Sequence, residues 1–327
     1  MFEPLGDVTL KSGERVSAAV IRGPDADWRE RISRLLGHKG DIWRWQNTEL
    51  LTHATGVDAW FYVLHRAGAP LAHILTAEVG GVGIFGHVWT EPADRGQSAA
   101  DRLMERQMAH FRARGGRALY LNTSPDNPAF KLYQRHGFSA LEPLSGAMVF
   151  AAGSVAEFEA DWFAPGKVSL EALAWRHWPA APALFMADIP GVVRCQPLGL
   201  LGRKSSEEAL LPWIQTATAP RVFVARKGNG AVVGLAAWDH DPASPGLICV
   251  DVFCHPHFWL QAPSLLTAAL AGAPSARRVA YADSSCPDKS AALEAAGFRP
   301  AATWLQRLAV DAAATHFADL VMFEHAG

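Results

Sequence analysis

The chain has 327 residues, of which 50% are hydrophobic and 19% charged, which is enough apolar material for two packed domains and unlike a disordered protein. Its formal net charge of −2, without a long basic run, argues against a nucleic-acid-binding surface. The N-terminus lacks a signal-peptide pattern and no apolar run approaches the roughly 20 residues of a membrane span, so we expect a cytoplasmic protein without a membrane partner.

Along the first half, the hydrophobic pattern predicts an α/β domain that begins with a hairpin and two helices. Three strands, a long helix, a strand, a short helix and a closing strand follow. In chain order these segments are residues 8–10 and 15–21, 25–36 and 42–55, 59–65, 70–78 and 83–91, 97–114, 118–121, 128–136, and 147–151. The apolar residues of the long helix recur at helical spacing, so we expect one face of it to lie against the sheet.

Residues 154–166 predict a linker, after which the second half repeats the order of the first. A hairpin, a strand, a helix, a strand and a helix are predicted at residues 221–225 and 232–238, 247–254, 262–270, 278–282, and 288–296. Pro92 and Phe138 are 46 residues apart in the first half, and Pro256 and Phe298 are 42 apart in the second. We therefore predict two related domains, residues 1–155 and 156–327.

The segment from Val88 to Ala100 predicts a corner that binds phosphate. A strand runs into a short loop of small and basic residues, and the long helix leaves that loop. The unpaired N–H groups of a helix's first turn and the positive end of its dipole attract phosphate. Arg95 adds a fixed positive charge, and the small residues around Gly96 leave room for a ligand. Such a corner suits a pyrophosphate.

This loop, together with a later block, resembles the GCN5-related N-acetyltransferase (GNAT) family. The family's loop, Q/R-x-x-G-x-G/A, corresponds here to Arg95, Ser98 and Ala100, with serine where glycine is usual. Its later block, N-x-x-A-x-x-x-Y-x-x-x-G-F, is matched less strictly, by Asn127, Ala129, Tyr133, Gly137 and Phe138. The order and distance of loop, strand and block make the resemblance more specific than a short glycine-rich pattern alone.

The resemblance implies an α/β (α+β) fold of two tandem GNAT domains, each a mixed, mostly antiparallel twisted sheet flanked by helices. In the N-terminal domain, a pair of splayed strands would bind coenzyme A. The residues implied for the cofactor are Val88, Trp89 and Thr90 along the pantetheine arm, Arg95, Gly96, Gln97, Ser98, Ala99 and Ala100 at the pyrophosphate, and Asn122, Asn127 and Tyr133 nearby.

Several of these residues have a second interpretation. The hydroxyl of Ser98 either crowds the phosphate or donates a hydrogen bond to it, and we favour donation because serine is small and common at helix starts. Asn127 suits a helix cap as well as a cofactor contact, and the two roles are compatible. Asn122 suits a turn about as well as a cofactor contact.

For catalysis, the resemblance implies that Tyr133 is the general acid that protonates the departing thiolate; the alternative is a packing tyrosine. The incoming amine must lose a proton, and His87, on the strand beside the cofactor, is our candidate for the base. A packing role for His87 is the alternative, and Glu78, Glu91 or a relayed water are other candidates for the base.

In the second half, the aligned positions lose this chemistry. Trp259 stands opposite Arg95 and Leu293 opposite Tyr133, and the loop at residues 257–261 has no glycine and several bulky rings. We expect this loop to exclude a pyrophosphate, which makes the second domain a degenerate copy. The run from Cys254 to His257 has no second ligand cluster, and the four cysteines follow no disulfide pattern, so we expect no metal.

The function predicted from these observations is transfer of an acetyl group from acetyl-CoA to the amine of an unidentified small molecule or peptide by direct attack. One alternative is an acyl-CoA-binding sensor or scaffold without catalysis, and another is a GNAT-type enzyme that uses a different acyl-CoA. We expect a monomer or a homodimer. For the acceptor, the family points to the region of the second helix, where Trp43, Arg44, Trp45 and Gln46 lie, but core packing suits the indoles as well.

Overall fold

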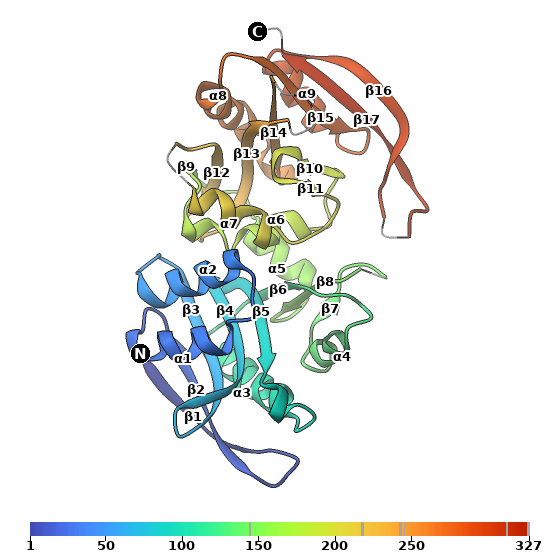
Figure 1. The fold of residues 1–327 in the computed structure, drawn as a ribbon. Coiled ribbons are helices and arrows are strands. Elements are labelled where there is room, and N and C mark those ends of the chain that lie inside the picture. Colours follow the sequence, from blue (N-terminus) through green and yellow to red (C-terminus); the bar gives the residue numbers. More distant parts are fainter. Residues whose placement is uncertain (144, 217–218, 242–243, 245, 312, 326–327) are drawn as a thin grey trace. The chain divides into compact units, whose positions relative to one another are not determined.

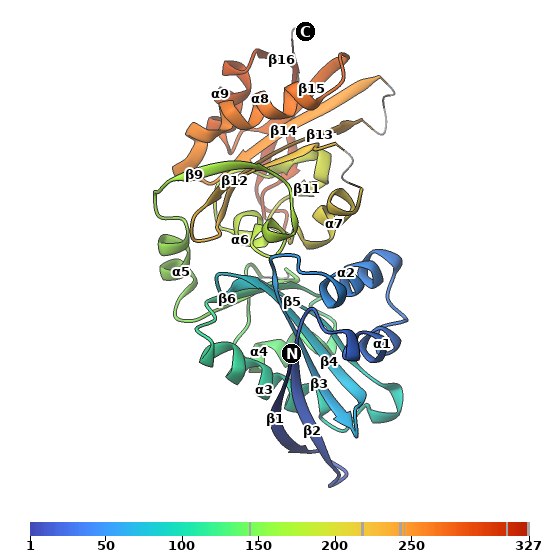
Figure 2. The ribbon, with the colours of Figure 1, turned by 90° about the vertical axis from the view of Figure 1, so that its left-hand side faces the viewer.

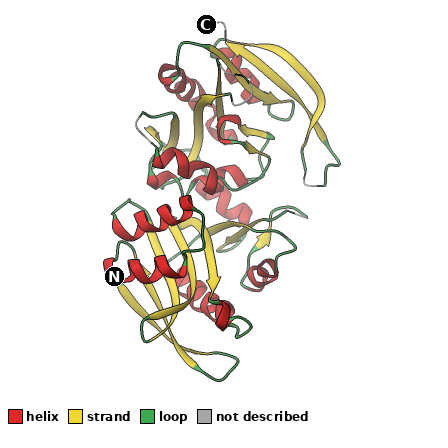
Figure 3. Ribbon diagram, in the orientation of Figure 1, coloured by secondary structure: helices red, strands yellow, loops and turns green. Residues whose placement is uncertain are grey.

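The chain folds into two compact units in the computed structural model, which describes residues 1–143, 145–216, 219–241, 244, 246–311 and 313–325 (Figure 1). One unit comprises Met1–Ser139 with Met148–Val155, and the other Ala140–Ala147 with Ala156–Gly327. Each unit has its own large, mixed sheet flanked by helices (Figure 3). This arrangement confirms the α/β fold class.

The first unit is built on an eight-stranded sheet in the order β1-β2-β3-β4-β5-β6-β8-β7. Its strands are β1 (Phe2–Thr9), β2 (Arg15–Arg22), β3 (Asp58–Arg66), β4 (Ala69–Val79), β5 (Val82–Thr90), β6 (Ala118–Asn122), β7 (Ser139–Ala140) and β8 (Ala147–Ala151). Its helices are α1 (Ala26–Leu35), α2 (Asp41–Thr52), α3 (Ala99–Ala113) and α4 (Pro128–Arg135). Most of these lie where the hydrophobic pattern predicts them. The short β7 was not predicted, and β1 spans Phe2–Thr9, whereas the pattern places that strand at residues 8–10.

Helices α1 and α2 cover one face of this sheet, and α3 and α4 cover the other (Figure 2). The apolar face of α3 packs into a core that also takes side chains from β3, β4 and β5. Leu103, Met104, Met108 and Phe111 are each at most 1% exposed, which confirms that this face of the helix lies against the sheet. The packing fixes the position of the loop that leads into α3.

The second unit has a seven-stranded sheet in the order β9-β12-β13-β14-β15-β17-β16. Its strands are β9 (Val168–Ala172), β12 (Val222–Lys227), β13 (Val232–His240), β14 (Leu247–Cys254), β15 (Arg277–Asp283), β16 (Phe298–Ala309) and β17 (Phe317–His325), with a separate pair β10 (Val193–Cys195) and β11 (Leu200–Leu201). Its helices are α5 (Val155–Trp162), α6 (Ala181–Met186), α7 (Glu207–Gln215), α8 (Ala262–Gly272) and α9 (Pro287–Ala295).

From β2 onward, the first sheet has the same strand order as the second. In both, the fourth and fifth strands are parallel. The last two strands of each unit lie in the sheet in the reverse of their order along the chain. The parallel strands pair over only three residues, from Val82 to Ile84 of β5 and from Leu247 to Cys249 of β14. Beyond these residues each pair separates, so each unit contains a gap between two splayed strands.

Two regions differ from the sequence prediction. The linker expected at residues 154–166 is wrong, because α5 occupies most of it; Phe158 and Trp162 lie one turn apart on the helix and are buried. The long hairpin of β16 and β17 went unpredicted, since most of β16 is exposed and lacks the alternation of a half-buried strand. Within the described residues, the helices are too short or too polar to cross a bilayer.

Candidate active site

The candidate site of the first unit starts at the splayed end of β5. Val88, Trp89 and Thr90 lie there, beyond the last residue that pairs with β6. Trp89 and Thr90 still pair with β4, through His73 and Ala72 respectively. One edge of this part of β5 is therefore held by β4, while the other edge faces the gap. An open strand edge of this kind offers its backbone groups to an extended ligand.

The loop after β5 has the geometry of an anion-binding corner. Ala99 and Ala100 begin α3, and their N–H groups precede the first intrahelical bond, which Arg102 N donates to the Ser98 carbonyl at 3.0 Å. Gly96 has φ +77°, and a Cβ built on it would meet no atom within 4 Å. The loop is thus open on the side where the small residues lie, and it presents donors without internal partners.

Ser98 adopts the left-handed conformation, with φ +65°, and its side chain makes no cap hydrogen bond. Glycine reaches this conformation without the steric penalty that a Cβ brings. The backbone of this loop therefore explains why glycine is usual at the position. The uncommitted hydroxyl is consistent with donation to a ligand, which stays a prediction.

Two sets of contacts brace this loop from the first hairpin. Ser12 N donates to Gln97 Oε1 at 2.9 Å, and Lys11 N donates to the Gln97 carbonyl at 3.2 Å. Arg66 donates to Glu14 at 2.6 and 2.7 Å and to Asp94 at 2.6 and 3.1 Å. The side chain and the carbonyl of Gln97 are held by the hairpin turn, so the backbone N–H of this residue is the part left for a ligand.

Arg95 lies against the end of β5. Its Nε donates to the Thr90 carbonyl at 3.2 Å, and its guanidinium carbon is 4.5 Å from the ring centroid of Trp89. The ring of His38, in the turn after α1, stacks on the same indole with a centroid distance of 3.6 Å. Trp89 therefore links the α1–α2 side of the sheet to the loop. The four remaining guanidinium N–H groups of Arg95 are free to meet an anion.

Tyr133 lies on α4 and faces the core below the gap. Its ring meets Phe85 of β5 edge-on at a centroid distance of 5.3 Å, and the residue is 8% exposed. Burial raises the pKa of Tyr133 to about 12, so the phenol is protonated at neutral pH. The residue belongs to the core and still carries a proton that it can donate, so both interpretations of it fit the geometry.

The two asparagines differ in their local roles. Asn127 is the N-cap of α4, and its Oδ1 accepts from Ala129 N at 2.9 Å, which confirms the capping role. Asn122 is exposed at the end of β6, where that strand has already separated from β5. A contact of either residue with a cofactor stays a prediction.

His87 lies on β5 with φ +54° and is 8% exposed. Its Nδ1 is 3.4 Å from Asn47 Nδ2, which also donates to the Trp43 carbonyl at 2.8 Å. Because the Asn47 amide is the donor, Nδ1 of His87 accepts, and the proton of the neutral ring lies on Nε2. Burial lowers the pKa of His87 well below its ordinary value. The ring is therefore neutral at pH 7, and its role as the base stays a prediction.

Of the alternative bases, Glu78 is committed elsewhere. Its carboxylate accepts from Arg114 at 2.9 and 3.1 Å and from Thr76 Oγ1 at 2.7 Å, and the residue is 1% exposed. Both carboxylate oxygens of Glu78 thus already accept hydrogen bonds within the protein. Glu91, at the end of β5, is half-buried.

The corresponding gap of the second unit is filled by the chain itself. The segment that includes β10 packs against β14 and β15. Val192 N and Val193 N donate to Asp283 Oδ2 at 2.8 and 2.7 Å, and Gln196 N donates to Asp251 Oδ2 at 2.8 Å. Lys289 Nζ, on α9, lies 2.6 Å from Asp251 and 2.8 Å from the Val193 carbonyl. The backbone of the segment is thus bonded on both sides, in the manner of a bound ligand.

The approach of this segment is equally tight. A Cβ on Gly191 would lie 3.0 Å from the Phe253 ring and 3.3 Å from Cys286, and this glycine has φ +111°. Arg194, which is 1% exposed, donates to the carbonyls of Phe185 and Ala187 at 2.7 and 3.0 Å. Burial lowers the pKa of Arg194 to about 10, so it remains charged at neutral pH. The contacts of Arg194 thus fix the conformation of the segment beside the gap.

The loop of the second unit, where bulky rings are predicted to exclude a pyrophosphate, is the 3₁₀ helix Pro256–Gln261. Phe258 is buried there, whereas Leu260 is 89% exposed. Exclusion of a pyrophosphate by these rings stays a prediction, and the sequence did not reveal the segment that packs against β14 and β15.

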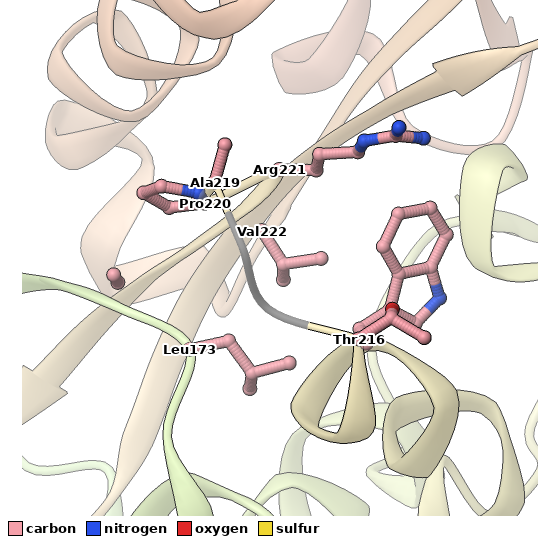
Figure 4. A pocket seen from close by; sticks show the side chains of 8 residues that line it. Leu173, Thr216, Ala219, Pro220, Arg221 and Val222 are labelled. Carbon is pink, nitrogen blue, oxygen red and sulfur yellow. The ribbon is translucent and has the colours of Figure 1, made fainter.

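A surface pocket of about 340 Å³ lies beside β12 in the second unit (Figure 4). Leu173, Thr216 and Arg221 are among the residues that line it. Arg221 is paired with Asp239 at 2.9 Å, and the other lining residues are mainly apolar. The described residues contain no cluster of His, Cys, Asp and Glu arranged to hold a metal ion.

Three residues of the first site escaped the sequence analysis. Asn47 and His73 contact His87, through its ring and its carbonyl respectively, and His38 contacts Trp89. The signal for His73 is present in the chain, as a polar residue within the buried run of β4. His38 lies in a turn, where a single histidine carries no pattern.

Comparison with known proteins finds a family match within the first unit. Residues 26–138 match the family model described as the acetyltransferase (GNAT) family. A comparison with curated proteins finds no match. Similar solved structures include the GNAT domain of S. lividans PAT, with 19% identity and a TM-score of 0.36 over 45% of this chain and 96% of that one.

Two further structures cover about half of this chain. The N-acetyltransferase from Staphylococcus aureus Mu50 has 17% identity and a TM-score of 0.36, over 49% of this chain and 98% of that one. The GNAT superfamily phosphinothricin acetyltransferase from Sinorhizobium meliloti, in complex with AcCoA, has 14% identity and a TM-score of 0.38, over 49% and 88%.

Proposed function

Because residues 26–138 match the model of the acetyltransferase (GNAT) family, we propose that this chain is an acyltransferase that moves an acetyl group from acetyl-CoA to an amine. The observation that carries the proposal is the edge of β5 that no longer pairs with β6 beyond Ile84, together with the loop from Arg95 to Ala100. Along the chain, the open backbone of a strand is followed by an arginine and by first-turn amides. This order matches the order of pantetheine and pyrophosphate along coenzyme A.

The shape of the loop fits this co-substrate. Gly96 has open space where a side chain would stand, and the small residues after it keep the approach to the α3 amides clear. The α3 dipole and Arg95 together supply positive charge where the phosphates would lie. Residues 1–155 are thus the proposed acetyl-CoA domain, and residues 156–327 the proposed degenerate copy, whose gap is occupied by its own chain.

In the proposed reaction, the neutral nitrogen of the acceptor attacks the thioester carbonyl, so that a C–N bond forms and the C–S bond breaks. A backbone N–H of β5 stabilises the negative charge that develops on the carbonyl oxygen. Tyr133 gives its phenolic proton to the departing thiolate; the phenol is protonated at neutral pH, although burial, which raises its pKa to about 12, makes it a weaker acid.

The nitrogen must also lose a proton, and His87 is the proposed acceptor of it. Burial keeps the ring neutral at pH 7, as a base requires. Its Nδ1 already accepts from Asn47, and its Nε2 carries the proton of the neutral ring. His87 can therefore accept the proton of the amine only if the proton on Nε2 first moves elsewhere, or if a water relays the transfer. The variant His87→Gln, with Asn47 unchanged, tests this step. If His87 is the base, the fall of kcat/KM at low pH that the wild type shows should be lost in the variant.

The overall activity is tested in two stages on the full-length protein. First, acetyl-CoA should raise the melting temperature, and a variant with Arg95→Glu should lose that shift. Second, release of free coenzyme A thiol should depend on an added amine, in a panel of small amines, amino acids and peptides. Binding without amine-dependent release for any acceptor would overturn the transferase.

A second candidate function is an acyl-CoA sensor without catalysis. Two observations favour it: Glu78 is committed to Arg114, and His87 holds its proton on Nε2. Propionyl-CoA and longer donors, tested in the same assay, separate a sensor from an enzyme that uses another acyl group. A sensor binds one of them without turnover, whereas the enzyme releases thiol with its own donor.

A further inference from the structure

The strand β5 has a bulge where it leaves β6. In its pairing with β4, His73 lies opposite Trp89 and Leu75 lies opposite Gly86, so that Ile74 alone faces two residues of β5. One of those two residues is His87, whose φ is +54°. A bulge disrupts the local ladder and leaves backbone groups that need another partner.

The side chain of His73 supplies that partner. Its Nδ1 lies 2.9 Å from the carbonyl oxygen of His87, and both residues are buried. A carbonyl oxygen accepts, so Nδ1 carries the proton and donates it. Burial lowers the pKa of His73 to about 4, so near pH 7 the ring holds one proton and commits it to the bulge. Nε2 of His73 has no hydrogen-bond partner among the described residues.

The direction of this bond determines where the next amide points. The carbonyl of His87 and the N–H of Val88 belong to one planar peptide unit and point in opposite directions. The imidazole that holds the carbonyl belongs to β4, on one side of β5. The N–H of Val88 is therefore directed away from the His73 ring.

Building on the proposed function, we propose that His73 is a positioning residue that holds the His87 carbonyl so that the Val88 N–H donates to the thioester oxygen. His73 itself touches no substrate. Its contribution is to keep a strained backbone conformation in place before the acetyl donor arrives, which is what an oxyanion donor needs.

The test compares His73→Asn with His73→Gln. The amide nitrogen of Asn stands near the position of Nδ1 and keeps the donor to the His87 carbonyl, whereas the Gln amide reaches the position of Nε2 and loses it. Thr76→Val is the matched control, because Thr76 is equally buried on β4 but donates to Glu78 at 2.7 Å and not to the bulge.

We expect His73→Gln to lower kcat by about 100-fold, as loss of one oxyanion donor does, with the Kd of acetyl-CoA changed less than about threefold. His73→Asn should keep kcat within about tenfold of the wild type, and Thr76→Val should leave it unchanged. Equal kcat in the Asn and Gln variants, or parallel losses of kcat and acetyl-CoA affinity in both, would overturn the positioning role.

A second measurement is independent of turnover. Acetyl-CoA alone, without an acceptor, should slow hydrogen exchange at the Val88 amide in the wild type and in His73→Asn, but not in His73→Gln. The same protection in all three proteins contradicts the proposal. If instead no amine gives thiol release while the Val88 protection follows this pattern, the proposed transfer fails and the positioning role of His73 stands.

Discussion

The two units carry the same gap and treat it in opposite ways. In both, two parallel strands pair over three residues and then separate. The first unit has His87 on β5 and Tyr133 on α4, and we propose that its gap binds a ligand. The second has Asp251 and Leu293 at the aligned positions, together with Lys289, and fills the gap with its own backbone. The shared strand order thus creates the gap, while a few side chains decide what occupies it.

The buried pair in the second unit gives the largest expected effect. Asp251 and Lys289 are both fully buried, so Lys289→Met leaves a carboxylate without its counter-ion and should lower the free energy of unfolding of that unit by about 3–5 kcal/mol. Denaturant unfolding followed by tryptophan fluorescence measures it. The double variant with Asp251→Leu should recover much of the loss. A cost below about 1 kcal/mol for the single variant would show that the pair does not hold the segment.

In the first unit, Tyr133→Phe tests whether the reaction takes place at the gap beside β5. We expect kcat to fall by about 100-fold, because the general acid is lost, while the acetyl-CoA Kd changes little. Tyr120→Phe is the control, since Tyr120 is a buried tyrosine on the neighbouring strand β6. Thiol-release kinetics and calorimetric titration separate the two quantities. Equal losses of turnover and affinity would assign Tyr133 to packing.

The charge at the loop should have a smaller effect. Arg95→Ala removes the fork beside the α3 amides, and we expect about a tenfold weaker acetyl-CoA complex, equivalent to about 1.4 kcal/mol. The converse change, Trp259→Arg, places an arginine at the aligned corner of the second unit. It should create no second binding site, because β10 still fills the gap. Native mass spectrometry reports the stoichiometry, and two bound molecules per chain would refute this view of the second unit.

Ser98→Gly should have the smallest effect. Glycine accepts the left-handed backbone of this position, so the variant should gain up to about 1 kcal/mol of stability. If the hydroxyl donates to phosphate, acetyl-CoA should bind a few-fold more weakly despite that gain. Ala67→Gly is the control, because Ala67 also has a positive φ, 46°, in the turn between β3 and β4. Tighter binding in Ser98→Gly alone would mean that the side chain crowds the ligand.

Much of the fold followed from local patterns in the chain. The apolar periodicity of α3, the turn residues between strands and the repeated distance from proline to phenylalanine predicted most elements of the first half and, in the second half, those from β12 to α9. The loop that leads into α3 was also predictable, because loop and helix start are adjacent in the sequence.

What the sequence did not reveal depends on contacts between distant segments. The partners of the segment near Val193 are Asp251, Asp283 and Lys289, which lie 58 to 96 residues later and on three different elements. A segment that includes proline, glycine and a buried arginine has no periodicity that predicts a strand inside a gap. The bulge at His87 likewise depends on the register with β4, which spacing along one strand does not fix.

The turn of the first hairpin bonds to Gln97 through Ser12 and Lys11, so the edge of the sheet is coupled to the loop. If acetyl-CoA binds this loop as proposed, it stabilises the conformation that the hairpin holds, and by thermodynamic reciprocity the closed hairpin raises the affinity for ligand by the same factor. Among the residues that the structure describes, the second sheet has no strand equivalent to β1. An insertion at this hairpin would therefore tune occupancy of the loop from outside the gap, without altering any residue that meets the acetyl donor.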